Sequence, residues 1–113
     1  MNNVSVLLIY TGGTIGMKED PVAGTLKPFD FKGILDEVPE LGKFAMTIDS
    51  YTFRPLIDSS DVEPGLWKSL AELIRDRYDR YDGFVILHGT DTLAYTAAAL
   101  YYMLNRIDKP VVM

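Results

Sequence analysis

The sequence GFVILHGTDTLAYTAAALYYML, residues 83–104, indicates the class of fold most clearly. It begins with the apolar run Phe84–Leu87, continues through five polar or small residues, and ends in the mostly apolar stretch Leu93–Leu104. A short, continuously apolar run is typical of a strand buried on both faces, and the longer stretch fits a helix packed on a sheet. These residues therefore predict a strand, a polar turn and a helix, which is the repeating unit of an α/β fold.

The same alternation extends over the rest of the chain. Further strands are predicted at Val4–Tyr10, at Met46–Phe53 and in the apolar residues after Pro110. A loop is predicted over Lys18–Pro28, which holds two prolines and a glycine. Apolar residues at helical spacing indicate two further helices. The first lies between Asp30 and Pro39, with the apolar residues Phe31, Ile34, Leu35 and Val38. The second follows Pro64, with the apolar residues Trp67, Leu70, Ala71, Leu73, Ile74, Tyr78 and Tyr81. We therefore expect an α/β fold with a mostly parallel, doubly wound sheet flanked by helices.

Composition excludes several classes of protein. The 113 residues suit one domain or a piece of one, so we treat residues 1–113 as a single domain. The absence of cysteine excludes a disulfide framework, a thiolate zinc site and a cysteine nucleophile. The net charge of −5 gives no electrostatic basis for binding nucleic acid or an anionic membrane. No apolar run approaches the ~20 residues of a transmembrane helix. The first residues lack the features of a signal peptide, so a cytoplasmic protein is expected.

Three polar turns follow predicted strands, namely Thr11–Gly16, Asp58–Asp61 and His88–Thr92. Ligands of open parallel sheets bind outside the carboxyl ends of the strands. If these turns meet at one edge, they give a shared pocket to five polar side chains: Thr14, Ser59, Ser60, Thr90 and Asp91.

Each turn also has a purely structural interpretation. The Thr11–Thr14 segment could be a tight turn that needs positive φ at its glycines. The Asp58–Asp61 segment could cap the helix that follows Pro64, with Asp61 or Glu63 as the capping residue, and Thr90–Thr92 could cap the helix that begins at Leu93. A lone histidine at a strand end, here His88, is more often structural than catalytic.

Several familiar site motifs are missing. There is no G-x-S-x-G elbow and no G-x-x-x-x-G-K-[ST] phosphate loop. Thr11–Gly16 comes close to the dinucleotide fingerprint, but Thr11 stands where the first glycine belongs. Asp58, Asp61 and Asp91 have no EF-hand spacing. We therefore expect no metal and no cofactor.

The three turns together are more specific than each one alone. TGGTIG at residues 11–16, DSSD at 58–61 and HGTDT at 88–92 strongly resemble the motifs of the bacterial-type L-asparaginases, and YTGGTIGM at 10–17 looks like the cytoplasmic type I branch. The resemblance covers essentially all 113 residues. It implies that the chain is the front part of a longer protein, which agrees with an apolar strand that stops at Met113, so the N-terminal domain is expected to be incomplete at its C-terminus.

The resemblance implies an amidohydrolase that converts L-asparagine and water to L-aspartate and ammonia through a threonine acyl-enzyme. The nucleophile of the family falls on Thr14, and its other catalytic pair falls on Thr90 and Asp91. Asp91 is also expected to bind the substrate's α-ammonium, and Thr90 to contact the substrate amide from its far side, where it helps to activate hydroxyl or water. The turn that binds the α-carboxylate in the family falls on Asp58, Ser59 and Ser60. The family also implies a homo-oligomer, a dimer or tetramer.

Two departures from the family pattern remain. The lysine that pairs with the second catalytic threonine would lie beyond Met113, so the 113-residue chain alone is expected to be inactive. The flexible loop Met17–Phe29 lacks the tyrosine of many members and has Thr25 or Leu26 near its place. The alternatives are an asparaginase-like subunit of a tRNA amidotransferase and a non-catalytic α/β fragment that binds a small ligand.

Overall fold

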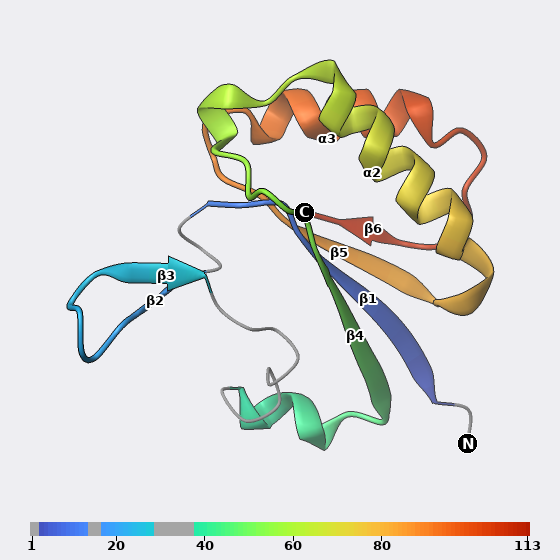
Figure 1. Ribbon diagram of the computed structural model, residues 1–113. Coiled ribbons are helices and arrows are strands. Elements are labelled where there is room, and N and C mark those ends of the chain that lie inside the picture. Colours follow the sequence, from blue (N-terminus) through green and yellow to red (C-terminus); the bar gives the residue numbers. More distant parts are fainter. Residues whose placement is uncertain (1–2, 14–16, 29–37) are drawn as a thin grey trace.

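The computed structural model describes residues 3–13, 17–28 and 38–113, which form a parallel sheet with two α-helices beside a small hairpin (Figure 1). The sheet contains four strands, β1 (Val4–Tyr10), β4 (Met46–Thr52), β5 (Gly83–Leu87) and β6 (Val111–Val112). The α-helices are α2 (Pro64–Arg77) and α3 (Leu93–Met103). The hairpin consists of β2 (Met17–Glu19) and β3 (Leu26–Pro28), and 3₁₀ turns occupy η3 (Pro39–Lys43), η4 (Ser59–Asp61) and η5 (Tyr78–Arg80).

The strand order is β4-β1-β5-β6, and every neighbouring pair is parallel. Leu8 at the centre of β1 pairs with Ser50 on one side and Val85 on the other. The chain moves from β1 to one edge at β4, crosses back over β1 to β5, and then continues outward to β6. This reversal makes the carboxyl ends of β1 and β5 a topological switch point, where doubly wound folds bind their ligands.

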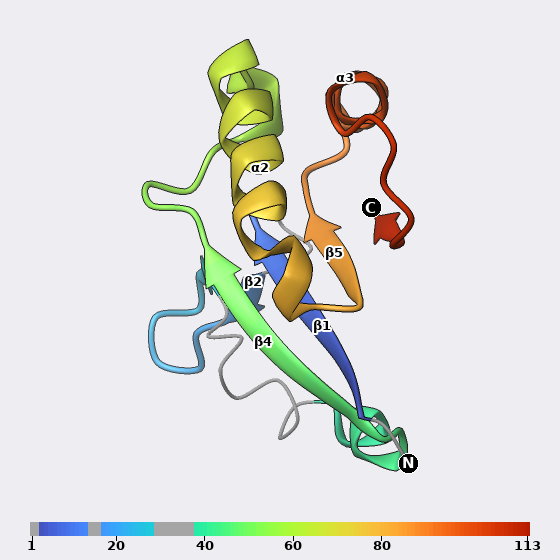
Figure 2. The ribbon, with the colours of Figure 1, turned by 90° about the vertical axis from the view of Figure 1, so that its right-hand side faces the viewer.

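The main core lies between the sheet and the two helices. Figures 1 and 2 show α2 and α3 over the same face of the sheet. Leu7 and Ile9 of β1 point into this core with no exposed surface. Each such side chain stabilises the fold by about 1.5–3 kcal/mol when it is fully buried. The core also contains eight further buried side chains from the helices, β5 and the residue after α3: Leu66, Leu70, Ala71, Ile74, Phe84, Ile86, Leu100 and Leu104.

The opposite face of the sheet carries a second, smaller cluster. Leu8 and Tyr10 alternate with the residues that face the helices, and they pack with Ile48, Val85 and Leu87. The alternation explains why the second half of β1 and the whole of β5 have continuously apolar sequences, since side chains on both faces of these segments are packed.

The predicted strands, the helix after Pro64 and the helix that begins at Leu93 are confirmed to within a few residues. The α2 helix ends at Arg77, so Tyr78 lies in the 3₁₀ turn η5 and Tyr81 in the connection to β5. The helix predicted between Asp30 and Pro39 lies outside the described residues, except for Val38, which is the N-cap residue of η3. None of the helices among the described residues is long and apolar enough to cross a membrane.

The prediction of a plain loop over Lys18–Pro28 was wrong, because this segment contains the antiparallel pair β2 and β3. Asp20 organises the turn between them. Its carboxylate accepts the amide hydrogens of Val22 and Ala23, and its backbone N–H donates to the Thr25 carbonyl at 2.8 Å. Gly24 adopts φ +67° in this turn. Strands of three residues leave no hydrophobic alternation for a sequence to reveal.

Candidate active site

The connections that follow β1, β4 and β5 meet at the carboxyl edge of the sheet. Thr11 extends β1 by one residue, and its backbone N–H and its hydroxyl each donate to the Leu87 carbonyl at 3.0 Å. On the other side, the Ile57 N–H donates to the Thr11 carbonyl at 2.8 Å. Thr11 therefore joins two segments to the end of β1 by hydrogen bonds: the end of β5 and the connection that follows β4.

Two glycines allow the three connections to approach this closely. Gly12 has φ +148° and Gly13 has φ +95°, both conformations that other residues rarely adopt. A Cβ on Gly12 would lie 2.1 Å from the Ile57 carbonyl oxygen, and one on Gly13 would lie 2.8 Å from the Gly89 Cα. The structural interpretation of this turn, that its glycines need positive φ, is confirmed. The close approach also brings the first and third sequence motifs into direct backbone contact.

Tyr10 supports the turn from the strand that precedes it. Its side chain has no exposed surface, and its hydroxyl donates to the Gly13 carbonyl at 2.7 Å. Burial raises the pKa of the Tyr10 phenol, so the hydroxyl remains a proton donor at neutral pH. Tyr10 thus holds the residue that precedes Thr14 in the sequence. Thr14 itself, the predicted nucleophile, lies outside the described residues.

The Asp58 side chain caps the short 3₁₀ turn η4 that directly follows it. The Asp58 carboxylate accepts the backbone N–H of Ser60 at 2.9 Å and its hydroxyl at 2.7 Å, which starts η4. These two bonds, the backbone bond first, lower the pKa of Asp58, so it is charged at neutral pH. The side chains of Asp58 and Ser60 are exposed. The Ser59 side chain belongs to the part that the structure does not describe.

The interpretation that the Asp58–Asp61 turn caps α2 was wrong. Glu63, the other candidate cap, occupies the N-cap position of α2, although its side chain makes no capping hydrogen bond. Pro64 begins the helix, and proline suits that position because its missing N–H would have no partner there.

Thr90 and Asp91 follow β5 on an exposed turn before α3. Within this turn the Leu93 N–H donates to the Thr90 carbonyl at 3.4 Å. Thr92 is the N-cap residue of α3, but its side chain makes no capping hydrogen bond. Side-chain capping by Thr92 therefore does not explain the sequence Thr90-Asp91-Thr92 in this turn.

His88, at the end of β5, is buried and makes its hydrogen bonds within the fold. It is 4% exposed, and its Nε2 lies 3.0 Å from the Thr96 hydroxyl on α3. Trp67 of α2 donates its indole N–H to the same hydroxyl at 2.9 Å. This link could not be found from the sequence, because Trp67 and Thr96 are far apart along the chain and neither belongs to a motif.

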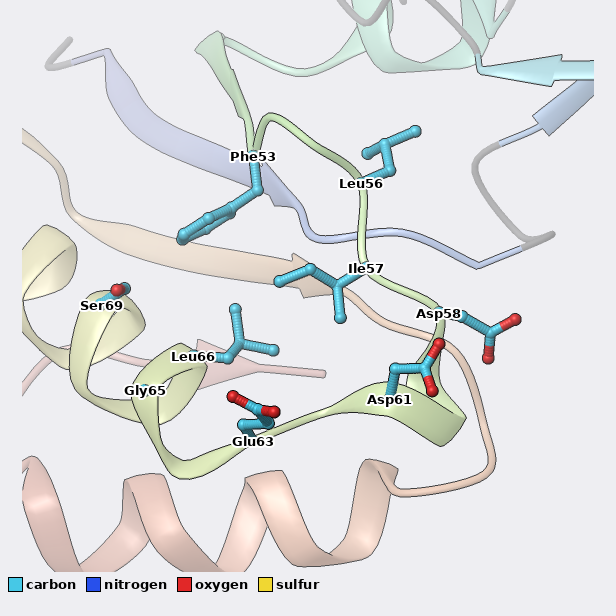
Figure 3. Close-up of a pocket in the computed structure, with 9 residues that line it drawn as sticks. All are labelled: Phe53, Leu56, Ile57, Asp58, Asp61, Glu63, Gly65, Leu66 and Ser69. Carbon is cyan, nitrogen blue, oxygen red and sulfur yellow. The ribbon is translucent and has the colours of Figure 1, made fainter.

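A hollow of about 570 Å³ lies between the β4 connection and the start of α2. Its apolar part includes Ile57 and Leu66, which face each other in Figure 3. Three carboxylates line it as well: Asp58, Asp61 and Glu63. Of the predicted site residues whose side chains the structure describes, Asp58 lines this hollow, whereas Ser60, Thr90 and Asp91 do not. Among the described residues, no group of three or more acidic or histidine side chains is arranged to hold a metal ion.

The fold and the site define an α/β domain with its predicted site residues on loops at the switch point of a parallel sheet. Residues 5–113 match the family model described as Asparaginase, N-terminal, and the chain therefore belongs to the asparaginase family.

Individual relatives agree with this assignment. The chain is 48% identical to L-asparaginase 1 of Escherichia coli strain K12, over 100% of this chain and 34% of that protein. It is 40% identical to a subunit of the glutamyl-tRNA(Gln) amidotransferase of Thermococcus kodakarensis, over 96% of this chain and 25% of that protein. The crystal structure of L-asparaginase I from Vibrio cholerae superposes with a TM-score of 0.80 at 43% identity, covering 98% of this chain and 34% of that one. The chain thus spans about a third of the length of L-asparaginase 1 from Escherichia coli.

Proposed function

We propose that the full-length protein is an L-asparaginase, which converts L-asparagine and water to L-aspartate and ammonia. The observation that carries the proposal is the backbone contact of Gly13 with Gly89, together with that of Gly12 with Ile57. Through these contacts the three motif-bearing turns share one edge of the sheet. The family assignment and the 48% identity to an L-asparaginase support the same activity.

In the proposed reaction, the Thr14 hydroxyl attacks the side-chain amide carbon of asparagine and forms an ester. The C–N bond breaks, and the amide nitrogen leaves as ammonia after it gains a proton. Water then hydrolyses the ester, which releases aspartate and restores the hydroxyl. A threonine hydroxyl is a weak nucleophile unless a neighbouring group accepts its proton. The flanking glycines favour close approach of backbone N–H groups to the developing oxyanion.

The other two turns are proposed to bind the charged ends of the substrate. Asp91 is proposed to pair with the α-ammonium group, since its carboxylate has the opposite charge and lies on an exposed turn. Thr90 is proposed to act on the reacting amide from the other side. The Asp58–Ser60 turn is proposed to bind the α-carboxylate, through the hydroxyl of Ser59 in particular. Asp58 would help by fixing the turn with its bonds to Ser60.

We also propose a cytoplasmic location and a homo-oligomer, a dimer or tetramer, on the strength of the resemblance to the type I branch. The net charge of −5 favours a small-molecule substrate over nucleic acid or an anionic membrane as the partner. We propose no cofactor for this chemistry, because a side-chain hydroxyl can serve as the nucleophile of an amide hydrolysis.

The test is ammonia release by the full-length protein from L-asparagine, from L-glutamine and from succinamate, which lacks only the α-ammonium group of asparagine. We expect rapid hydrolysis of L-asparagine and much slower hydrolysis of succinamate, because succinamate lacks the ammonium group that Asp91 is proposed to bind. Failure to release ammonia from L-asparagine would contradict the proposal.

A second candidate is an amidotransferase subunit, which the 40% identity to the glutamyl-tRNA(Gln) amidotransferase of Thermococcus kodakarensis favours. The same assay distinguishes the two. An asparaginase releases ammonia from L-asparagine at full rate without tRNA. An amidotransferase subunit is expected to respond to glutamyl-tRNA and to the other component of its complex.

A further inference from the structure

A buried chain of hydrogen bonds connects both helices to the turn that carries Thr90 and Asp91. It runs from the Trp67 indole on α2 to the Thr96 hydroxyl on α3 at 2.9 Å, and from there to His88 Nε2 at 3.0 Å. The other ring nitrogen of His88, Nδ1, lies 2.6 Å from the Gly89 carbonyl oxygen. Thr96 has no exposed surface and His88 is 4% exposed, so the bond between these two side chains is shielded from water.

With a neutral His88 ring, the chemistry of the groups fixes the direction of every bond in the chain. An indole N–H can only donate, so the Thr96 oxygen accepts from Trp67 and is free to donate its own hydrogen to His88 Nε2. A neutral imidazole that accepts at Nε2 carries its hydrogen on Nδ1. That hydrogen faces the Gly89 carbonyl, which can only accept. All donors and acceptors of the chain are thereby matched.

The last bond sets the orientation of a peptide plane beside the site. In a planar trans peptide the C=O and the following N–H point in opposite directions. Holding the Gly89 carbonyl toward the His88 ring therefore turns the Thr90 N–H the opposite way. Gly89 also lies against Gly13, with its Cα and nitrogen 2.8 and 2.9 Å from the position of a Gly13 Cβ. The chain of bonds thus ends at the contact between the first and third motifs.

We propose that Trp67, Thr96 and His88 act as positioning residues that fix the Gly89–Thr90 peptide for catalysis. This inference rests on the proposed function, since it assigns the three residues to the reaction that Thr90 takes part in. None of the three is proposed to touch the substrate. Trp67 acts by donating a hydrogen bond to the Thr96 oxygen, which orients the hydroxyl hydrogen toward His88. Without the indole, the Thr96 hydroxyl could turn to the Thr92 carbonyl one helical turn earlier, as threonines in helices often do.

The central variant is Thr96→Val in the full-length protein, because valine keeps the shape of threonine and removes only the hydroxyl. Thr96→Ser is the rescue variant, since serine can make both bonds. The matched control is Tyr81→Phe, which removes a hydrogen bond from the buried Tyr81 hydroxyl to Asp49 at 2.7 Å, before β5 and away from the turn that follows it. Thermal unfolding, kcat and KM for L-asparagine are measured for all three.

We expect Thr96→Val to lower kcat on the order of 100-fold, the loss that a misplacement of about 1 Å can cause. Thr96→Ser should retain most of the activity. Tyr81→Phe should lose a similar amount of thermal stability as Thr96→Val and keep its kcat. The positioning role is overturned if Thr96→Val keeps the wild-type kcat at a temperature where it is fully folded, because the bonds would then serve stability alone.

A second readout does not depend on activity, so it separates failure of this inference from failure of the proposed function. Nitrogen NMR of the histidine rings, with His88 assigned from a His88→Gln variant, should find the hydrogen on Nδ1 in the wild type and in Thr96→Ser. Thr96→Val should change the ring signals and the amide signals of Gly89 and Thr90. Unchanged signals in Thr96→Val would overturn the inference, even if the wild type released no ammonia from asparagine.

Discussion

Replacing Gly12 by alanine tests whether backbone contact holds the three motif-bearing turns together. The new Cβ would lie 2.1 Å from the Ile57 carbonyl oxygen, well inside the 3.4 Å at which ordinary contact begins. The carbonyl belongs to the backbone and not to the end of a flexible side chain, so the β1 and β4 connections must separate. The separation would break the hydrogen bond from the Ile57 N–H to the Thr11 carbonyl, which is 2.8 Å long.

The expected cost has three parts. Forcing backbone apart costs about 1–3 kcal/mol, the lost hydrogen bond about 1 kcal/mol, and a side chain at φ +148° about 1–2 kcal/mol. Gly12→Ala should therefore lower the free energy of unfolding by about 4 kcal/mol, a large part of the roughly 5–15 kcal/mol that holds a typical protein together.

Two further glycine-to-alanine variants serve as controls. Gly24 also has positive φ, +67°, but a Cβ there meets nothing within 4 Å, so only the backbone cost of about 1 kcal/mol is expected. Gly65 lies in α2 with open space around it, and alanine there should stabilise the helix by up to ~1 kcal/mol. Urea unfolding of the full-length variants, followed by far-ultraviolet circular dichroism, gives all three values. If Gly12→Ala lowers the free energy of unfolding no more than Gly24→Ala does, the close contact with Ile57 does not hold the turns together.

Two other predictions follow from the same geometry. Burial raises the pKa of Tyr10, and burial and the Asp49 hydrogen bond raise the pKa of Tyr81, so the folded protein keeps these protons at a pH where the unfolded chain has lost them. The free energy of unfolding should therefore fall as the pH rises above the ordinary tyrosine pKa of 10.0, and it should fall less steeply in Tyr10→Phe. Chemical unfolding at a series of pH values measures both slopes. Asp91→Asn should raise KM for L-asparagine by about 10–100-fold, because the variant loses a charge-assisted hydrogen bond that contributes about 1.5–3 kcal/mol to binding. The control variant Asp79→Asn, at an exposed position, should leave KM unchanged.

The strands of the sheet were predictable because their burial on both faces leaves an unbroken apolar sequence. Leu7 and Ile9 face the helices while Leu8 and Tyr10 face the other way, so no polar residue interrupts the second half of β1. The turn at Gly12 and Gly13 was also predictable, since paired glycines directly after a strand indicate positive φ.

Other features were predicted only in part or not at all. The sequence offered Asp61 and Glu63 as caps of α2; the structure puts Glu63 at the N-cap position, while Asp58 bonds to Ser60 within its own turn. The Trp67–Thr96 hydrogen bond exists only because α2 and α3 pack side by side on one face of the sheet. Sequence spacing alone could not find this bond, because it is decided by tertiary packing.

The main proposal is that Thr14 is the nucleophile of an L-asparaginase. It is tested most directly by the turnover of L-asparagine by the full-length Thr14→Ala variant, with binding of L-asparagine to the same variant measured by calorimetry. We predict a fall in kcat of at least ~10³-fold with binding retained, because Asp91 and the Asp58–Ser60 turn hold the charged ends of the substrate. A Thr14→Ala variant with near-normal kcat would contradict the proposal and would make Thr90 the candidate nucleophile.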